Sequence, residues 1–201
     1  MGCGKGDIAI PLASLGYQII GVDVFPAVIE TAKFRKTKLL NQDNSVEFLV
    51  GDAESLNIRN QLFDFIICTE VLEHLEHPEK ALDSIFSLLK KNGTLIVTIP
   101  NGYGPYSLFF NSFTTKIAYA IARKIQHSPH VQAFTFSRFQ KLIEERGFRI
   151  FEVGHSDFIS FLPFLVNLKG FCKIDCAIAD RLPSPFVGGW FLACRKRNEA
   201  L

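Results

Sequence analysis

The chain has 201 residues, of which 48% are hydrophobic and 21% charged, and its formal net charge is +2. This length fits one domain with a sizeable core, and the lysines and arginines are scattered except at residues 195–197, so nothing in the charge pattern predicts a nucleic-acid partner. The longest apolar stretch, residues 158–168, is too short to cross a bilayer, which takes roughly 20 residues.

The cysteines indicate a reducing compartment. There are five of them, an odd number, and no signal-peptide pattern precedes them, so we expect a cytoplasmic location. Only Cys172 and Cys176 lie close together, and no second Cys/His pair stands at ligand spacing, which argues against a zinc site.

In chain order, helical patterns alternate with short apolar runs rich in Val, Ile and Leu. The predicted strands are residues 17–24, 46–50, 63–68 and 94–99, and the predicted helices are residues 7–15, 26–40 and 79–90. Apolar runs of this kind are typical of strands buried on both faces of a parallel sheet. The last of these helices begins after Pro78 and is predicted to stop at Asn92-Gly93. The alternation predicts an open α/β sheet.

The C-terminal part of the chain predicts one more helix and two more strands. Residues 137–146 have an amphipathic helical pattern closed by Gly147, and residues 148–153 and 190–195 predict an antiparallel hairpin at the sheet edge. No repeat or linker divides the chain, so we expect a single domain. Its predicted core is residues 1–104, 131–154 and 188–197, and its predicted lid or cap is residues 105–130 and 155–187.

Residues 2–6, GCGKG, predict a glycine-rich loop that approaches a ligand. Asp23 ends the following strand, where a carboxylate can accept hydrogen bonds from both hydroxyls of a ribose. Asp52 ends the next strand in the same way and would lie near an adenine amino group, and Thr69-Glu70 follow the third strand. Ligands of open α/β sheets bind at this carboxyl edge. Both a dinucleotide and S-adenosylmethionine remain candidates, although the third glycine comes one residue early for the dinucleotide pattern.

Several segments together resemble the class I S-adenosylmethionine-dependent methyltransferases, in the group that contains the ubiquinone-biosynthesis O-methyltransferases. The segments are GCGKG, GVD, GDAESL, FDFIICTEVLEHLEHPEKAL, LLKKNGTLIVTIPN and SRFQKLIEERGF, and the likeness covers about residues 1–153. The resemblance implies a Rossmann-like, doubly wound α/β fold whose mostly parallel sheet has an antiparallel edge hairpin and a helical cap. It also implies the residues that contact S-adenosylmethionine: Gly2, Cys3, Gly4, Asp23, Val24, Asp52, Ala53, Glu70 and Val71.

In the family that the chain resembles, a strand ending in Asp or Glu precedes the glycine loop, whereas here Met1 stands inside the loop motif. We therefore expect the first strand of the sheet to be missing, as in a shortened version of a longer protein. The missing strand would leave two strand edges unpaired and remove a cofactor contact. The expected consequence is weak or no cofactor binding, and a non-catalytic methyltransferase-like protein is one alternative.

The stretch TEVLEHLEH carries the candidate metal ligands. By resemblance to some quinone O-methyltransferases, Glu70, Glu73 and His74 could hold a divalent ion such as Mg²⁺, although Mg²⁺ usually prefers oxygen ligands. His130 falls where relatives carry a histidine near the substrate, and either His130 or His74 could accept a proton from the acceptor.

The acceptor itself is predicted only as a class. Residues 106–125 and 158–187 are rich in aromatic and apolar side chains, which favours a hydrophobic, quinone-like or sugar-like small molecule, or reversible contact with a membrane surface. The predicted function is methyl transfer from S-adenosylmethionine to an oxygen of this acceptor. A nicotinamide-type oxidoreductase is the other enzymatic alternative.

Overall fold

The computed structural model describes residues 1–40, 45–58, 61–104, 131–156, 175, 177–183 and 186–197. The predicted cap segments lie mostly outside these residues, so the division into core and cap stays a prediction. In the described part of the chain, no helix is long and apolar enough to cross a membrane.

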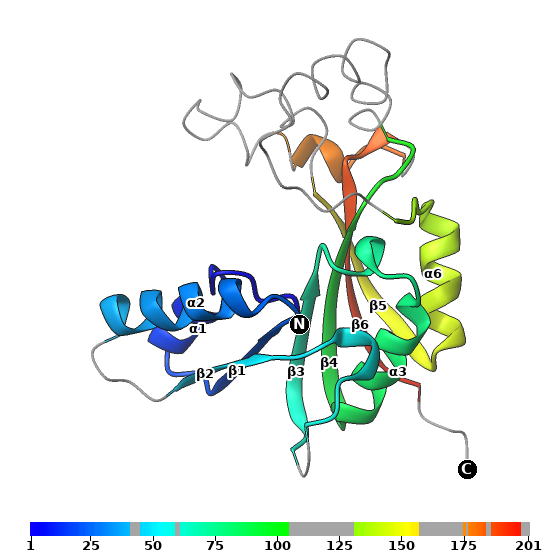
Figure 1. Cartoon of the computed structure of the whole chain (residues 1–201). Helices are drawn as coiled ribbons and strands as arrows, with labels where there is room; N and C mark the ends of the chain where they lie inside the picture. Colours follow the sequence, from blue (N-terminus) through cyan, green and yellow to red (C-terminus); the bar gives the residue numbers. More distant parts are fainter. Residues whose placement is uncertain are drawn as a thin grey trace.

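The described strands form two separate sheets (Figure 1). In the first sheet, β1 (Ile19–Asp23) and β2 (Val46–Val50) pair in parallel. The second sheet has the order β3-β4-β6-β5. Its strands are β3 (Phe63–Thr69), β4 (Leu89–Pro100), β5 (Phe148–His155) and β6 (Gly189–Lys196). β3 and β4 are parallel, and β6 is antiparallel to both β4 and β5, which confirms the predicted antiparallel hairpin.

The helices follow the chain signals that predicted them. The elements are α1 (Ala9–Ser14), α2 (Pro26–Leu39), α3 (Pro78–Leu88), α6 (Phe136–Glu145) and the short 3-10 turns η1 (Ala53–Ser55) and η2 (Leu72–His74). Proline occupies the first turn of α2 and of α3, where its missing N–H costs nothing. The Thr135 side chain caps α6 by accepting a hydrogen bond from the Arg138 N–H, and Gly147 follows with φ +83°.

One predicted boundary is wrong. α3 ends at Leu88 and β4 begins at Leu89, so Asn92-Gly93 lies inside the strand and does not stop the helix. Leu89 pairs with Phe63 before the register shifts, and it is completely buried. A Cβ on Gly93 would lie 2.9 Å from the Phe63 carbonyl oxygen, so glycine allows the two strands to approach at this irregularity.

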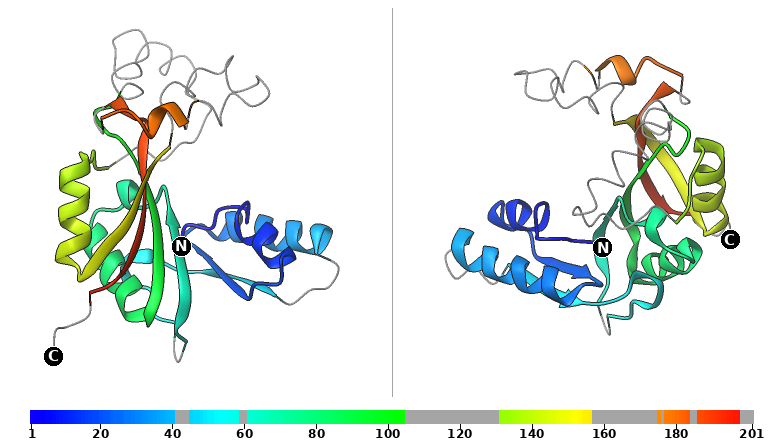
Figure 2. Two further views of the ribbon diagram at one scale, coloured as in Figure 1. Left: turned by 180° about the vertical axis from the view of Figure 1, so that it is seen from behind. Right: turned by 45° about the horizontal axis from the view of Figure 1, so that its top comes forward.

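The hydrophobic core is divided between the two sheets. α3 and α6 cover one face of the four-stranded sheet, while α1 and α2 pack on β1 and β2 (Figures 1 and 2). The larger cluster includes Leu82 and Phe139 from the helices and Leu95 and Trp190 from the strands. The smaller cluster contains Ala9, Ala13, Ile29, Ala32, Val46 and Phe48. Each sheet is therefore stabilised mainly by its own helices.

β1 and β3 are neighbouring edges of the two sheets, and no described strand lies between them (Figure 1). The first residues of the chain cross this gap. The Met1 amino group donates to the Ile67 carbonyl of β3 over 2.7 Å, and the Cys3 N–H donates to the Val22 carbonyl of β1 over 2.9 Å. The α/β fold with a mostly parallel arrangement is confirmed.

Candidate nucleotide site

The glycine loop lies between β1 and β3 and depends on left-handed backbone conformations. Gly2, Gly4 and Gly6 have φ of +62°, +53° and +82°, which L-residues rarely adopt. A Cβ on Gly2 would overlap the Val71 side chain, whereas a Cβ on Gly4 would meet no atom within 4 Å. The loop is thus packed tightly against the segment after β3 at Gly2 and is open at Gly4.

Asp23, at the end of β1, holds the loop in place. One carboxylate oxygen accepts a hydrogen bond from the Gly4 N–H over 2.9 Å, and the other accepts from the Phe25 N–H over 3.1 Å. A carboxylate has about four acceptor positions, so these two bonds leave capacity for ligand hydroxyls. Asp23 therefore both orders the loop and presents acceptors at the sheet edge.

Cys3 lies in the same loop and is half-buried. Burial raises the pKa of its thiol to about 11, with the Asp23 charge adding to the effect. At neutral pH this side chain is therefore a neutral thiol and not a nucleophile.

Asp52 follows β2 beside the same edge. The Gly51 N–H donates to the Asp23 carbonyl, which ties the two strand ends together. One oxygen of Asp52 accepts a hydrogen bond from the Glu54 N–H over 2.9 Å at the start of η1, and Glu54 in turn accepts from the His77 N–H. The second oxygen of Asp52 has no hydrogen bond in the described part of the chain. Asp52 is therefore fixed in place with one acceptor available.

Glu70 follows β3 in a left-handed conformation with φ +53°, the only described non-glycine residue with positive φ. Such a conformation costs about 1 kcal/mol or more and concentrates at functional sites. The Thr98 hydroxyl of β4 donates a hydrogen bond to the Glu70 carboxylate over 2.8 Å, and the Glu70 N–H donates to the Thr98 carbonyl. The strained turn directs Val71 onto Gly2, so the structure brings the loop and residues 70–71 together.

Comparisons with known proteins fit this arrangement. Residues 1–97 match a family described as methyltransferase domain. Over 101 residues the chain is 35% identical to the ubiquinone biosynthesis O-methyltransferase of Rickettsia typhi, a match that covers 50% of this chain and 39% of that protein. The first half of the chain is therefore similar to methyltransferase domains. The mitochondrial ubiquinone biosynthesis O-methyltransferase of Schizosaccharomyces pombe is 27% identical over 195 residues, covering 96% of this chain and 64% of the relative.

The architecture of the chain also has solved counterparts. Magnesium protoporphyrin IX methyltransferase from Synechocystis, solved with bound SAH, has a TM-score of 0.59 and 19% identity over 97% of this chain and 71% of its own. At this identity the likeness shows the fold. The chain spans less than two thirds of the length of the two ubiquinone-biosynthesis relatives. None of the matches named here favours the oxidoreductase alternative.

The predicted metal ligands do not gather into a site in the described part of the chain. Glu73 and His74 approach each other, with 3.7 Å between the Glu73 carboxylate and His74 Nε2, but the Glu70 carboxylate is bonded to Thr98. Among the described residues, no three His, Cys, Asp or Glu side chains gather as metal ligands would. The predicted metal site is therefore not supported: the Glu70 carboxylate accepts a hydrogen bond from Thr98, and residues 70–74 form a strained turn and a 3-10 turn in place of one helical face.

Glu73 is instead a buried carboxyl group. Its side chain is 1% exposed, and within the described ranges neither oxygen receives a hydrogen bond. Burial raises the pKa of the Glu73 carboxyl to about 8. The main-chain N–H of Glu73 partly opposes this shift, although it forms no hydrogen bond with the carboxyl, and the Glu70 charge adds to the shift. Its carbonyl accepts hydrogen bonds from the Val131 and Gln132 N–H groups. Glu73 therefore joins η2 to the segment that leads into α6.

His130 lies outside the described residues. Two other polar residues, Asn101 and His155, lie at the end of the second sheet where β3 and β4 finish. Asn101, after β4, is buried, donates to the Val187 carbonyl and accepts from the Tyr103 N–H. His155, at the end of β5, has Nδ1 3.5 Å from the Asp180 carboxylate, and the same oxygen accepts its main-chain N–H. The sequence signal for Asn101 was its place after the strand, but nothing local indicated the pairing of His155 with Asp180.

Proposed function

We propose that the chain binds S-adenosylmethionine and transfers its methyl group to an oxygen of a small, quinone-like acceptor. The observation that carries the proposal is the Gly4–Asp23 hydrogen bond beside Asp52 and residues 70–71, in a domain of the methyltransferase family. The ubiquinone-biosynthesis relatives support an acceptor of the quinone class.

The described residues fit such a cofactor. The glycine loop would present main-chain groups to the cofactor through Gly2, Cys3 and Gly4. Asp23 would use its remaining acceptor positions to bind the ribose hydroxyls, and Asp52 and Ala53 would contact the adenine. Val24, exposed beyond Asp23, and the strained Glu70-Val71 turn would flank it. When bound, the cofactor supplies an electrophilic methyl group. The chain contributes orientation, because a displacement at carbon needs the nucleophile in line with the leaving group.

An oxygen nucleophile also needs a proton acceptor. We propose His130 and His74 for this role. His74 is 29% exposed and lies in η2, directly after the turn at Glu70. A divalent metal is not part of the proposal, because no three possible ligand side chains gather in the described part of the chain.

The test measures S-adenosylhomocysteine binding by calorimetry on the whole chain, carried to millimolar ligand because a split sheet is expected to bind weakly. Asp23→Asn should weaken binding at least tenfold, since hydrogen bonds to a charged group are worth about 1.5–3 kcal/mol. Asp64→Asn is the matched control: Asp64 is 71% exposed in β3 and pairs with Lys90.

Activity is then followed as transfer of a labelled methyl group to a catechol, with His74→Ala and His130→Ala as variants. Equal affinity of Asp23→Asn and the unaltered chain would contradict the proposed site. Binding that is intact without transfer to any catechol would retain the site and contradict the acceptor class. No binding by the unaltered chain would favour the non-catalytic alternative.

A further inference from the structure

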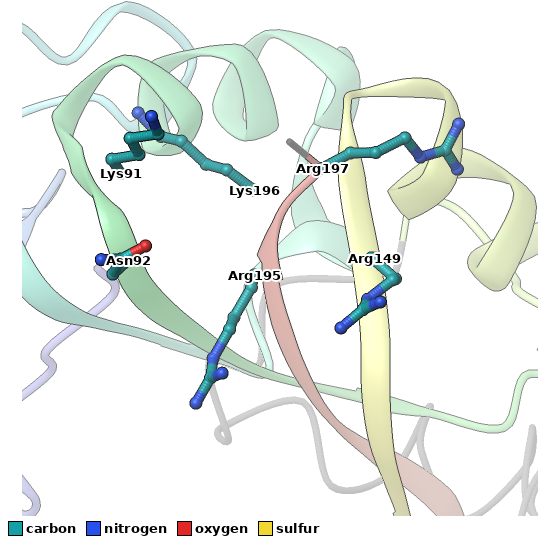
Figure 3. Close-up of a pocket in the computed structure, with 6 residues that line it drawn as sticks. All are labelled: Lys91, Asn92, Arg149, Arg195, Lys196 and Arg197. Atoms are coloured by element: carbon teal, nitrogen blue, oxygen red, sulfur yellow. The ribbon is translucent and has the colours of Figure 1, made fainter. Parts of the chain in front are cut away.

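A strongly basic hollow lies on the second sheet, at the end of β4 opposite to Glu70 and Thr98. It is lined by Lys91 and Asn92 from the start of β4, Arg149 from β5, and Arg195, Lys196 and Arg197 from the end of β6 (Figure 3). Its volume is about 260 Å³. The five cations exceed the net charge of the whole chain, which is +2. The fold thus adds Lys91 and Arg149 to the basic run at residues 195–197.

Two of the cations are held directly opposite each other. Arg149 and Arg195 are partners in the antiparallel register of β5 and β6, and both are exposed on the same face. Like charges at directly opposed positions destabilise a sheet. In the part of the chain that the structure describes, none of the five cations forms an ion pair with an acidic side chain. An anion between them would remove this repulsion.

Aromatic rings fix two of the cationic side chains. The Arg195 guanidinium lies 4.8 Å from the centre of the Phe151 ring, and Lys196 Nζ lies 4.6 Å from the centre of the Phe86 ring. Partial burial lowers the pKa of Lys196, so a neighbouring anion would favour its charged form. In Figure 3, Lys196 extends toward Lys91, whereas Arg197 points away from the hollow. Cations held in this way lose little side-chain entropy on binding.

We propose that this hollow binds a small molecule through a phosphate or diphosphate group, with Arg149 and Arg195 as the principal contacts. Two guanidinium groups on adjacent strands present several N–H donors in planes that match phosphate oxygens. The volume of about 260 Å³ suits a small anion. The site is independent of the proposed methyl transfer.

The test uses inorganic pyrophosphate as the probe, added to the whole chain in low-salt buffer without phosphate, with binding measured by calorimetry and by thermal shift. Arg149→Gln/Arg195→Gln should raise the dissociation constant at least tenfold. The control Lys33→Gln/Lys38→Gln removes the same charge from α2, where Lys33 pairs with Glu30 and Lys38 lies over Phe34. It should change the dissociation constant less than twofold.

The stability of the variant provides a second readout. Removing two opposed charges should leave the melting temperature of Arg149→Gln/Arg195→Gln unchanged or raise it, and pyrophosphate should no longer raise it further. The proposal is overturned if pyrophosphate at about 5 mM does not bind, since this concentration exceeds a weak dissociation constant of about 1 mM. It is also overturned if both double variants lose pyrophosphate binding equally. It is also overturned if anionic vesicles or a single-stranded oligonucleotide bind through these residues and pyrophosphate does not compete.

Discussion

Replacing Glu73 by glutamine tests whether a neutral carboxyl group is built into the site. Glutamine keeps the shape of the side chain and removes its titration. Glu73 is 1% exposed, and burial raises its pKa from the usual 4.5 to about 8. Because the folded state binds this proton more tightly than the unfolded state does, unfolding between these pH values releases a proton.

The sign and the size of the effect follow from this difference. Below pH 4.5 the carboxyl is protonated in both states, and its contribution to stability is fully present. As the pH rises from 4.5 through 8 the contribution is lost, because only the unfolded state ionises readily. At about 1.4 kcal/mol for each tenfold change in proton affinity, the loss reaches about 3 kcal/mol at pH 7 and approaches 5 kcal/mol above pH 8. Glu73→Gln should show no such loss.

The measurement is urea unfolding at several pH values from 5 to 8, in the presence of EDTA. The chain has one tryptophan, and Trp190 is 2% exposed in the larger core, so its fluorescence reports the unfolding of the second sheet. Glu30→Gln is the control, since Glu30 is 71% exposed on α2 and pairs with Lys33. The control should follow the pH dependence of the unaltered chain.

Parallel pH profiles for Glu73→Gln and the unaltered chain would refute the reasoning. They would mean that Glu73 is ionised in the folded protein, as it would be beside a bound cation. Repeating the unaltered chain with Mg²⁺ in place of EDTA separates these cases, because a bound ion would stabilise the protein more as the pH rises.

Three further predictions concern the elements that hold the site. Gly2→Ala should lower the unfolding free energy by about 1–3 kcal/mol, because its Cβ would overlap Val71 and φ is +62°; urea unfolding measures this, with exposed Ala27→Gly as a comparison. Asn101→Ala should cost about 1–3 kcal/mol in the same assay, because the buried Val187 carbonyl loses its donor. An N-terminal extension of six apolar residues and an aspartate should raise the urea midpoint by pairing both β1 and β3, whereas a polar extension of equal length should not.

The alternation of strands and helices could be predicted because its signals are local. Each apolar run, such as residues 46–50, became a strand, and each proline start, such as Pro78, became the first turn of a helix. The end of α3 could not be predicted in this way. Gly93 has the usual appearance of a helix stop, but pairing of Leu89 with Phe63, a residue 26 positions earlier, makes the segment a strand.

The candidate site was predictable to the same extent. Asp23, Asp52 and Glu70 could be predicted because each lies at or just after the end of a strand, and parallel strands bring their carboxyl ends to one edge. The metal prediction relied on helical spacing from Glu70 to His74. The structure has a strained turn followed by a single 3-10 turn there, so the spacing no longer places the side chains on one face. The positive φ at Glu70 is a tertiary effect that no local pattern reports.

The basic hollow depends on register, which explains why composition argued against a concentration of charge. Lys91 and Arg149 lie far along the chain from the basic run at residues 195–197, and the β5–β6 pairing brings Arg149 to Arg195. From Lys91 to Thr98, β4 rises about 23 Å at roughly 3.3 Å per residue, so the hollow and the nucleotide site lie at opposite ends of one strand. Pyrophosphate and S-adenosylhomocysteine should therefore bind independently. Competition between them would mean that one of the two sites has been assigned to the wrong end of the sheet.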